Sequence, residues 1–194
     1  PALQNFYYNG EPRGFFQWVA IRDCDAPGNG ELHSGNCKAK AWHHTGKADR
    51  WMGDMVWLMY AYKFYEKEYN SQKYDEITTL IKNLLLSWYK DEQDHGGYIQ
   101  HGWRKGDSRL HEDGGHHEGN IDAYALFKLT GDTQIAGRIK HWLDSQLREN
   151  KDLPLDLYTW RVLAYGKDSA HLLDIPDYDL RFRKTLTFNG KKVT

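Results

Sequence analysis

The chain has 194 residues, and its 26 basic and 27 acidic side chains leave a formal net charge of −1 at pH 7. This balance, with no basic stripe, argues against nucleic acid as a partner. The hydrophobic fraction of 40% is enough to build the core of one domain. No apolar run approaches the about 18 residues that a membrane span needs, so we expect no membrane partner either.

Two cysteines, Cys24 and Cys37, flank a polar, Gly-rich loop. Their short spacing favours a disulfide over two free thiols, and a disulfide implies an oxidising compartment. The chain opens at Pro1 without a signal peptide, which fits a mature secreted protein, a trimmed chain or a fragment. We therefore expect a secreted or periplasmic protein with a disulfide between these cysteines.

The first helical hairpin is predicted after an irregular arm. Residues 1–47 hold turn signals and little helical periodicity, so we expect an extended N-terminal arm or short strands, with loops, there. From Asp49, a plausible N-cap, apolar residues recur at helical spacing on nearly all sides, which predicts a buried inner helix. After Asn70-Ser71 an amphipathic outer helix follows, with the apolar stripe Tyr74, Ile77, Ile81, Leu84, Leu85 and Trp88.

A long connection and two further helical units follow. Residues 91–117 are rich in His, Asp and Gly and predict a functional loop, with room for a short hairpin around Tyr98-Ile99. Glu118 begins a second inner helix, and Asp132 is the expected cap of its outer helix, whose stripe is Ile135, Ile139, Trp142, Leu143 and Leu147. A third unit begins at Leu157 and turns at residues 166–169.

These units repeat one plan, in which an apolar inner helix leads through a polar turn to an outer helix. One such hairpin cannot bury its inner helix, so neighbouring hairpins must stack beside it. The fold class is therefore predicted to be mainly all-α: one α/α toroid, or part of one, over residues 1–194, with helical hairpins over 48–175. Apolar and polar side chains alternate over residues 178–188, and Asn189-Gly190 follows as a turn. This pattern predicts a β-hairpin over residues 178–194 whose return strand stops early, which suggests a fragment.

Four motifs carry a resemblance to a known family. They are Arg50-Trp51-Met52-Gly53-Asp54-Met55-Val56-Trp57, Asp94-His95-Gly96-Gly97-Tyr98, Glu118-Gly119-Asn120-Ile121-Asp122-Ala123-Tyr124 and Leu129-Thr130-Gly131-Asp132. Over residues 48–190 the chain resembles six-hairpin glycosidase-like proteins, α/α toroids that include unsaturated glucuronyl hydrolases, endoglucanases and polysaccharide lyases. The resemblance implies a glycoside hydrolase acting on an oligo- or polysaccharide without a cofactor. It also implies that this chain is about half of a toroid, completed by missing sequence or by a second copy.

Three carboxyl groups are candidates for the catalytic pair that hydrolyses a glycosidic bond, one as acid and one as base or nucleophile. Asp54 lies one turn into an otherwise apolar helix, where a buried carboxylate must be paired, protonated or functional. Glu118 and Asp122 share one helical face because they are four residues apart. The alternatives are structural: Asp54 and Asp122 would hydrogen-bond loop amides, and Glu118 would complement the helix dipole.

The candidate substrate-binding residues are neighbours of these carboxyl groups and one tryptophan of the long loop. The neighbours are Trp51, Trp57, His116, His117, Asn120 and Tyr124, and the loop residue is Trp103. Core packing is an equally good explanation for Trp51. His111, Glu112, Asp113, His116 and His117 lack the spacing of a recognised zinc motif, so we expect no metal. Two other functions stay open: a non-catalytic glycan-binding or scaffold module, and a polysaccharide lyase that uses a Tyr or His base.

Overall fold

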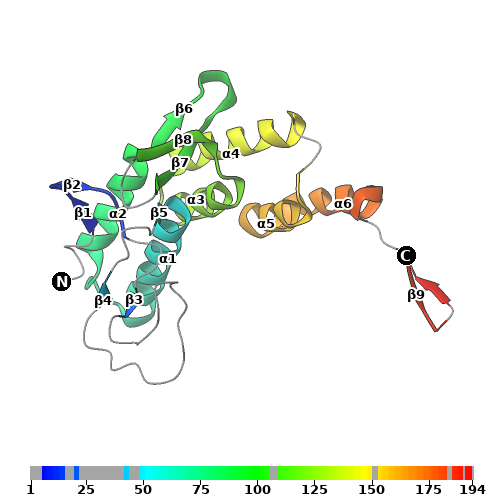
Figure 1. Cartoon of the computed structure of the whole chain (residues 1–194), viewed down its shortest axis with the longest axis horizontal. Helices are drawn as coiled ribbons and strands as arrows, with labels where there is room; N and C mark the ends of the chain where they lie inside the picture. Colours follow the sequence, from blue (N-terminus) through cyan, green and yellow to red (C-terminus); the bar gives the residue numbers. More distant parts are fainter. Residues whose placement is uncertain are drawn as a thin grey trace. The chain divides into compact units, whose positions relative to one another are not determined.

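The computed structural model describes residues 6–15, 20–21, 42–43, 49–104, 109–149, 153–182, 185–189 and 191–193. Within them the chain is mainly helical with a small sheet, which confirms the mainly all-α class (Figure 1). The chain divides into two compact units, Pro1–Lys90 with Tyr98–His116, and Asp91–Gly97 with His117–Thr194. No helix in the described ranges is both long and apolar enough to cross a membrane. Closure into one toroid stays a prediction.

The first unit contains the predicted first hairpin, formed by α1 (Met52–Tyr69) and α2 (Asp75–Ser87). The two helices pack against each other through aliphatic and thioether side chains that exclude water. The buried members are Met52, Met55, Val56 and Met59 of α1 and Ile81, Leu84 and Leu85 of α2. Gly14 of the N-terminal arm lies in close contact with both helices: a Cβ at this position would be 2.9 Å from Leu84 Cδ2 and 3.1 Å from Met55 Sδ.

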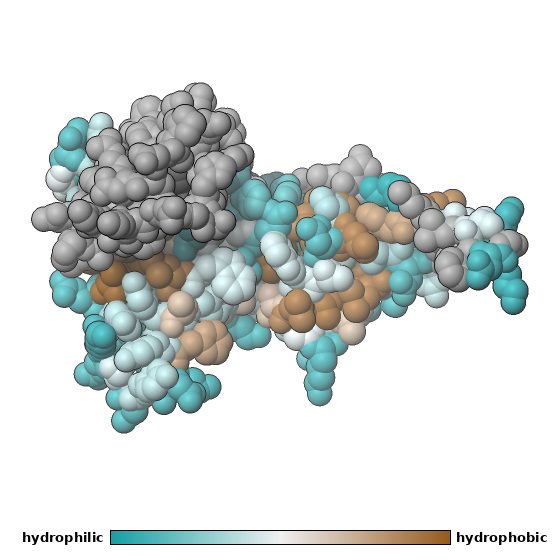
Figure 2. Space-filling view, turned by 60° about the horizontal axis from the view of Figure 1, so that its bottom comes forward, coloured by the Kyte–Doolittle hydropathy of each residue, from teal (hydrophilic) through white to brown (hydrophobic). Residues whose placement is uncertain are grey.

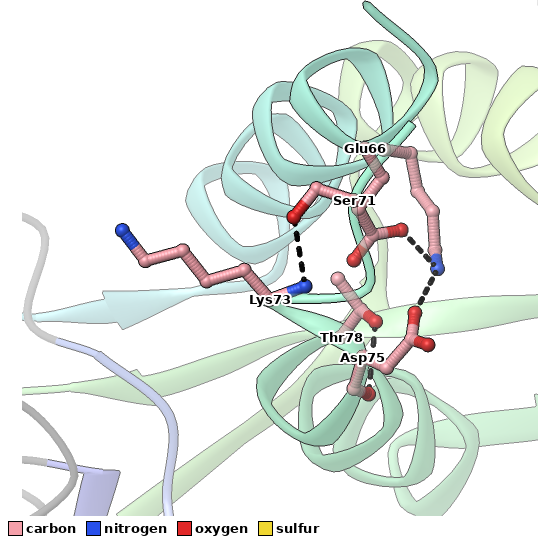
Figure 3. A network of polar contacts seen from close by, with 6 residues as sticks. Glu66, Ser71, Lys73, Asp75 and Thr78 are labelled. Carbon is pink, nitrogen blue, oxygen red and sulfur yellow. Dashed lines mark hydrogen bonds and ion pairs between the residues drawn. The ribbon is translucent and has the colours of Figure 1, made fainter. Parts of the chain in front are cut away.

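The turn between α1 and α2 is held by polar contacts (Figure 3). Asn70 adopts the left-handed conformation, with φ 46° and ψ 50°, and its N–H donates to the carbonyl of Glu66. This is the αL ending that Asn tolerates better than most residues. Lys63 Nζ then bridges Glu66 Oε2 at 2.7 Å and Asp75 Oδ1 at 3.4 Å, which ties the end of α1 to the start of α2.

The start of α1 differs from the prediction. Asp49 is not its N-cap: α1 begins at Met52, Trp51 occupies the N-cap position, and no side chain caps the helix. Arg50 and Trp51 instead form a short strand, β5 (Arg50–Trp51), which pairs with β7 (Gly97–Arg104). The ladder hydrogen bonds of this pairing extend the chain up to Met52, where the helix can begin.

The connection at 91–117 is more ordered than the predicted loop with a short hairpin. It contains the 3-10 helix η2 (Gln93–His95), strand β7 and strand β8 (Arg109–Gly115), which pairs antiparallel with β7. Strands β5, β6 (Tyr89–Asp91), β7 and β8 form a four-stranded sheet in which β7 pairs with the other three. The expected short strands of the arm are confirmed by two antiparallel pairs: β1 (Tyr7–Tyr8) with β2 (Glu11–Pro12), and β3 (Ala20–Ile21) with β4 (Trp42–His43).

The second unit is built around α3 (His117–Leu129), which packs against α4 (Thr133–Glu149) and α5 (Leu155–Tyr165). Asp132 immediately precedes α4, and its carbonyl accepts the N–H of Ala136, in keeping with the predicted cap position. The apolar stripe of α4 is confirmed, since Ile139, Trp142 and Leu143 are buried. The inner helix α3 is buried on several sides, through Gly119, Asn120, Ile121, Ala123, Tyr124, Leu126 and Phe127.

The third predicted hairpin, which begins at Leu157, has no long outer helix within the described residues 166–182. After Gly166 the chain forms the 3-10 helix η3 (Lys167–Leu173), then α6 (Asp174–Tyr178) and the 3-10 helix η4 (Leu180–Phe182). The strand predicted from Tyr178 is wrong over 180–182, because the Asp179 carboxylate accepts the Arg181 N–H at 2.9 Å and folds the segment into a turn. The C-terminal hairpin itself is confirmed as β9 (Leu186–Phe188) with β10 (Lys191–Val193).

Two of the predicted inner helices expose apolar side chains. The prediction that α1 is buried on nearly all sides is wrong, because Trp57 and Phe64 are 60% and 62% exposed. On α5, Leu163 is 81% exposed. Figure 2 shows brown, hydrophobic surface over α5 and α6. The exposed aliphatic side chains of these two helices are Leu155, Leu163 and Ile175. Hydrophobicity on all sides of a helix predicts its burial only when neighbouring elements cover each side.

Candidate functional site

Asp54 is a half-buried carboxyl group in the first turn of α1. Its Oδ2 is shielded from solvent and has no hydrogen-bond partner in the part of the chain that the structure describes. Burial raises the pKa of this carboxyl above its ordinary value, because removal from water disfavours the charged form. The pKa of Asp54 is thus shifted in the direction that a proton-donating carboxylic acid needs.

A group of aromatic rings lies where β5 meets β7 and β8. Trp51 packs edge-on against His101 and His111, with ring centroids 5.6 and 6.0 Å away. His101 Nδ1 and His111 Nδ1 are 2.8 Å apart, so one of these nitrogens carries the proton that the other accepts. The His116 ring centroid is 5.4 Å from that of His101. We call Trp51, His101, His111 and His116 the histidine cluster.

The histidine cluster joins residues from three places in the sequence. The register explains the meeting, because Trp51 pairs with Gly102, and Gly102 pairs with His111. Gly102 has φ +119°, and a Cβ there would lie 2.1 Å from the Arg50 carbonyl oxygen, so only glycine lets β7 approach β5 this closely. His101 was not predicted as a site residue, because its partner Trp51 lies fifty residues earlier and no local spacing connects them.

The two other tryptophans predicted to bind substrate have different surroundings. The Arg13 guanidinium lies over the Trp103 ring, 3.2 Å from its centroid, so one face of that ring is already covered. Trp57 is 60% exposed on α1 and lies beside Tyr60, with ring centroids 5.8 Å apart. Of these two, Trp57 has the more accessible ring for a sugar.

The remaining predicted site residues belong to α3, in the second unit. Glu118 is in the first turn and Asp122 follows one turn later, and both are half-buried, whereas Asn120 between them is fully buried. A fully buried Asn is a structural residue rather than a direct ligand of a sugar, unless the packing around it changes. Glu118 and Asp122 keep the shared helical face that their spacing predicts.

His117 and Tyr124 pack within the second unit. The His117 ring stacks on Trp142, with centroids 5.3 Å apart and planes 24° apart. Tyr124 is only 7% exposed and packs edge-on against Tyr165, with centroids 5.0 Å apart. Both rings therefore contribute to packing between helices, which leaves neither an open face comparable to that of Trp57.

The second unit also holds a buried charged group that the sequence analysis did not identify. Arg161 of α5 is fully buried and donates from Nη2 to the Leu143 carbonyl at 2.9 Å, while its Nε and Nη1 have no partner among the described residues. Asp144 receives Lys140 Nζ at 2.6 Å and the Tyr165 hydroxyl at 3.3 Å. Burial lowers the pKa of Arg161, and burial together with the Asp144 charge raises the pKa of Tyr165.

Two predictions fall wholly or partly beyond what the structure describes. Cys24 and Cys37 lie outside the described residues, so their disulfide stays a prediction. The side chains of Glu112 and Asp113 lie outside them too. Among the side chains that are described, no three of the His, Cys, Asp and Glu type form a group that could hold a metal ion.

The candidate residues thus form two sets. Asp54, the histidine cluster and Trp57 belong to the first unit, and Glu118 and Asp122 to the second. Comparisons of the chain with protein-family models, with curated proteins and with solved structures find no match.

Proposed function

We propose that this chain is a glycan-cleaving protein, a glycoside hydrolase in which Asp54 is the general acid. The observation that carries the proposal is the Asp54 carboxyl group, whose Oδ2 is buried without a hydrogen-bond partner among the described residues. An acid in this surrounding keeps its proton to a higher pH than an exposed aspartate does. Such a carboxyl group destabilises the folded protein when it is ionised, which favours a functional reason for its presence.

The proposed reaction needs two carboxyl groups. Asp54 gives its proton to the glycosidic oxygen as the bond from that oxygen to the anomeric carbon breaks. A water molecule adds to the anomeric carbon and transfers a proton to the second carboxylate, either Glu118 or Asp122. Glu118 and Asp122, the two candidates for this second carboxylate, are both half-buried on one face of α3.

The proposed fold of the enzyme is a toroid of helical hairpins. The support is the difference between α3, which is buried on several sides where α4 and α5 flank it, and α5, whose Leu163 is 81% exposed. Helices that are apolar on all sides need such neighbours. Asp54 and Glu118 each lie in the first turn of their own helix, and helix starts are the parts of such a toroid that line the substrate cup.

The direct test is glycan cleavage by acid-deleted variants. Asp54→Asn and Glu118→Gln are assayed against a panel of soluble polysaccharides by release of reducing ends. General acid catalysis contributes about 10²–10⁴-fold, so we expect a loss of this size for Asp54→Asn. Asp75→Asn is the matched control, because Asp75 is also a first-turn aspartate but is half-exposed and paired with Lys63. Equal turnover of wild type and both acid variants rejects the proposal, and binding without any cleavage favours a non-catalytic module.

A polysaccharide lyase is the second candidate, favoured by the histidine cluster. His111 is 8% exposed and shares a hydrogen bond with His101, which fixes the position of a nitrogen that can accept a proton. A lyase abstracts a proton beside a uronic-acid carboxylate and leaves an unsaturated product that absorbs ultraviolet light. An absorbance rise that His111→Gln abolishes and Asp54→Asn preserves would replace the hydrolase proposal with this one.

A further inference from the structure

The side of α1 that faces solvent carries three aromatic rings in a row. Trp57, Tyr60 and Phe64 follow one another at intervals of three and four residues, so they lie along one side of the helix. The ring centroids of Trp57 and Tyr60 are 5.8 Å apart, and those of Tyr60 and Phe64 are 6.3 Å apart with planes 25° apart. We call these three residues the aromatic strip.

The aromatic strip is accessible at both ends. Trp57 is 60% exposed and Phe64 is 62% exposed, whereas Tyr60 between them is partly covered. Exposed tryptophan and phenylalanine side chains leave a large apolar area in water, and adjacent exposed aromatics of this kind mark interaction sites. Seven residues separate Trp57 from Phe64, so the strip extends for about 10 Å along the helix axis.

The composition of the strip indicates what it binds. The buried α1–α2 interface uses Met, Val, Leu and Ile, and beside it Tyr62 and Tyr65 of α1 pack on Tyr74 at the start of α2. The exposed surface of α5 and α6 mixes the aliphatic side chains of Leu155, Leu163 and Ile175 with the separate rings of Trp160 and Tyr178. The strip on α1 contains aromatic rings only. A flat ring face matches the C–H face of a pyranose ring, and a row of rings matches successive sugars of one chain better than it matches the knobs of a packed helix.

The strip is continuous with the candidate acid. Asp54 precedes Trp57 by three residues on the same helix, which places the two about 4.5 Å apart along the axis and on neighbouring parts of its surface. A sugar chain lying on the strip would therefore extend along α1 toward the turn that carries Asp54. This placement distinguishes a substrate-binding surface from an isolated apolar patch.

We propose that Trp57, Tyr60 and Phe64 form an extended binding surface for a polysaccharide chain, which makes the substrate a polymer rather than a mono- or disaccharide. The inference rests on the proposed glycan-cleaving function but assigns a separate activity, chain binding. A second copy of this protein would be the occupant if the strip were a protein interface. The experiment that follows distinguishes a second copy from a polysaccharide chain.

The experiment measures binding and mass on the same variants. Trp57→Ala and Phe64→Ala are compared with wild type by affinity electrophoresis in gels containing xylan, mixed-linkage β-glucan, polygalacturonate, alginate or hyaluronan. Leu163→Ala is the matched control, because it removes an exposed apolar side chain from α5, a helix that carries no residue of the strip. We expect wild type and control to be retarded by at least one polysaccharide, and both strip variants to bind it about tenfold more weakly.

Several outcomes would overturn the inference. One is equal retardation of wild type and both strip variants, and another is no retardation by any of the five polysaccharides. A third is a wild-type dimer, measured by light scattering, that Trp57→Ala converts to a monomer, because the strip would then be a protein interface. Asp54→Asn separates this inference from the proposed function: it should abolish cleavage and leave retardation unchanged. Loss of binding on the strip variants with no effect of Asp54→Asn on cleavage would support the strip and reject the acid.

Discussion

Gly102 is the residue on which the arrangement of the histidine cluster depends most directly. In Gly102→Ala the new Cβ would lie 2.1 Å from the Arg50 carbonyl oxygen and 3.2 Å from Trp51 Cα, so the β5–β7 pairing cannot persist unchanged. The backbone conformation adds strain, because φ is +119°. Strain of this kind costs about 1–3 kcal/mol, and overpacking costs a similar amount. We therefore expect the free energy of unfolding to fall by about 2–6 kcal/mol.

The matched control is Gly114→Ala, in β8 of the same unit. Gly114 also has positive φ, +67°, but a Cβ there would meet no atom within 4 Å. Only the left-handed backbone penalty applies, so the expected loss is about 1–2 kcal/mol. Urea unfolding followed by circular dichroism measures both variants. Equal losses for the two variants would refute the reasoning, because the contact with Arg50 would then contribute nothing.

Three further predictions concern single side chains. Asp54→Asn should stabilise the protein at pH 7, because the raised pKa of the buried carboxyl means that its ionised form destabilises the fold. The gain in stability should fade below about pH 4, where Asp54 is protonated in the unfolded chain too, and a gain independent of pH would contradict this. Arg161→Met should leave the melting temperature unchanged or raise it, because an apolar side chain avoids the cost of burying the guanidinium. A clear drop would show that the Leu143 hydrogen bond and the Asp144 charge outweigh that cost. Ile139→Ala should lower the free energy of unfolding by about 2–5 kcal/mol, because Ile139 is fully buried in α4. Leu163 is 81% exposed, so Leu163→Ala should change stability by less than about 0.5 kcal/mol. Similar values for the two variants in urea unfolding would show that the burial assigned to α4 is wrong.

The helical part of the fold could be predicted from the sequence because helical periodicity is a local signal. The stripes of α2 and α4 place Ile81, Leu85, Ile139 and Leu143 in the core, as the pattern predicts. The start of α1 could not be predicted in the same way. Asp49 is a good N-cap residue by type, but Arg50 and Trp51 pair with β7, which lies some fifty residues later in the chain.

The candidate site was predictable only in part. Asp54 stood out because a carboxyl group in an apolar helix is unusual, and its burial agrees with that argument. The prediction that Tyr124 and His117 bind substrate rests on sequence adjacency to Glu118, whereas both rings are engaged in packing between helices. His101 was missed because strand register, not local sequence, brings it to Trp51.

The exposed rings of α1 show what periodicity leaves undetermined. Trp57 and Phe64 have the same hydrophobic character as core residues, and the pattern therefore predicted burial. Their exposure depends on whether another element covers that side, which the residues of α1 do not encode by themselves. The same surface is the basis for the proposed polysaccharide-binding strip.

The most direct measurement of the central claim compares two substrates of Asp54→Asn. A general acid is needed to protonate a poor leaving group, such as the oxygen of another sugar, and is dispensable for a good one, such as dinitrophenolate. We expect kcat/KM on the polysaccharide to fall by about 10²–10⁴-fold and kcat/KM on a dinitrophenyl glycoside of the same sugar to fall far less. Equal losses on both substrates, or no loss on the polysaccharide, would contradict the assignment of Asp54 as the acid.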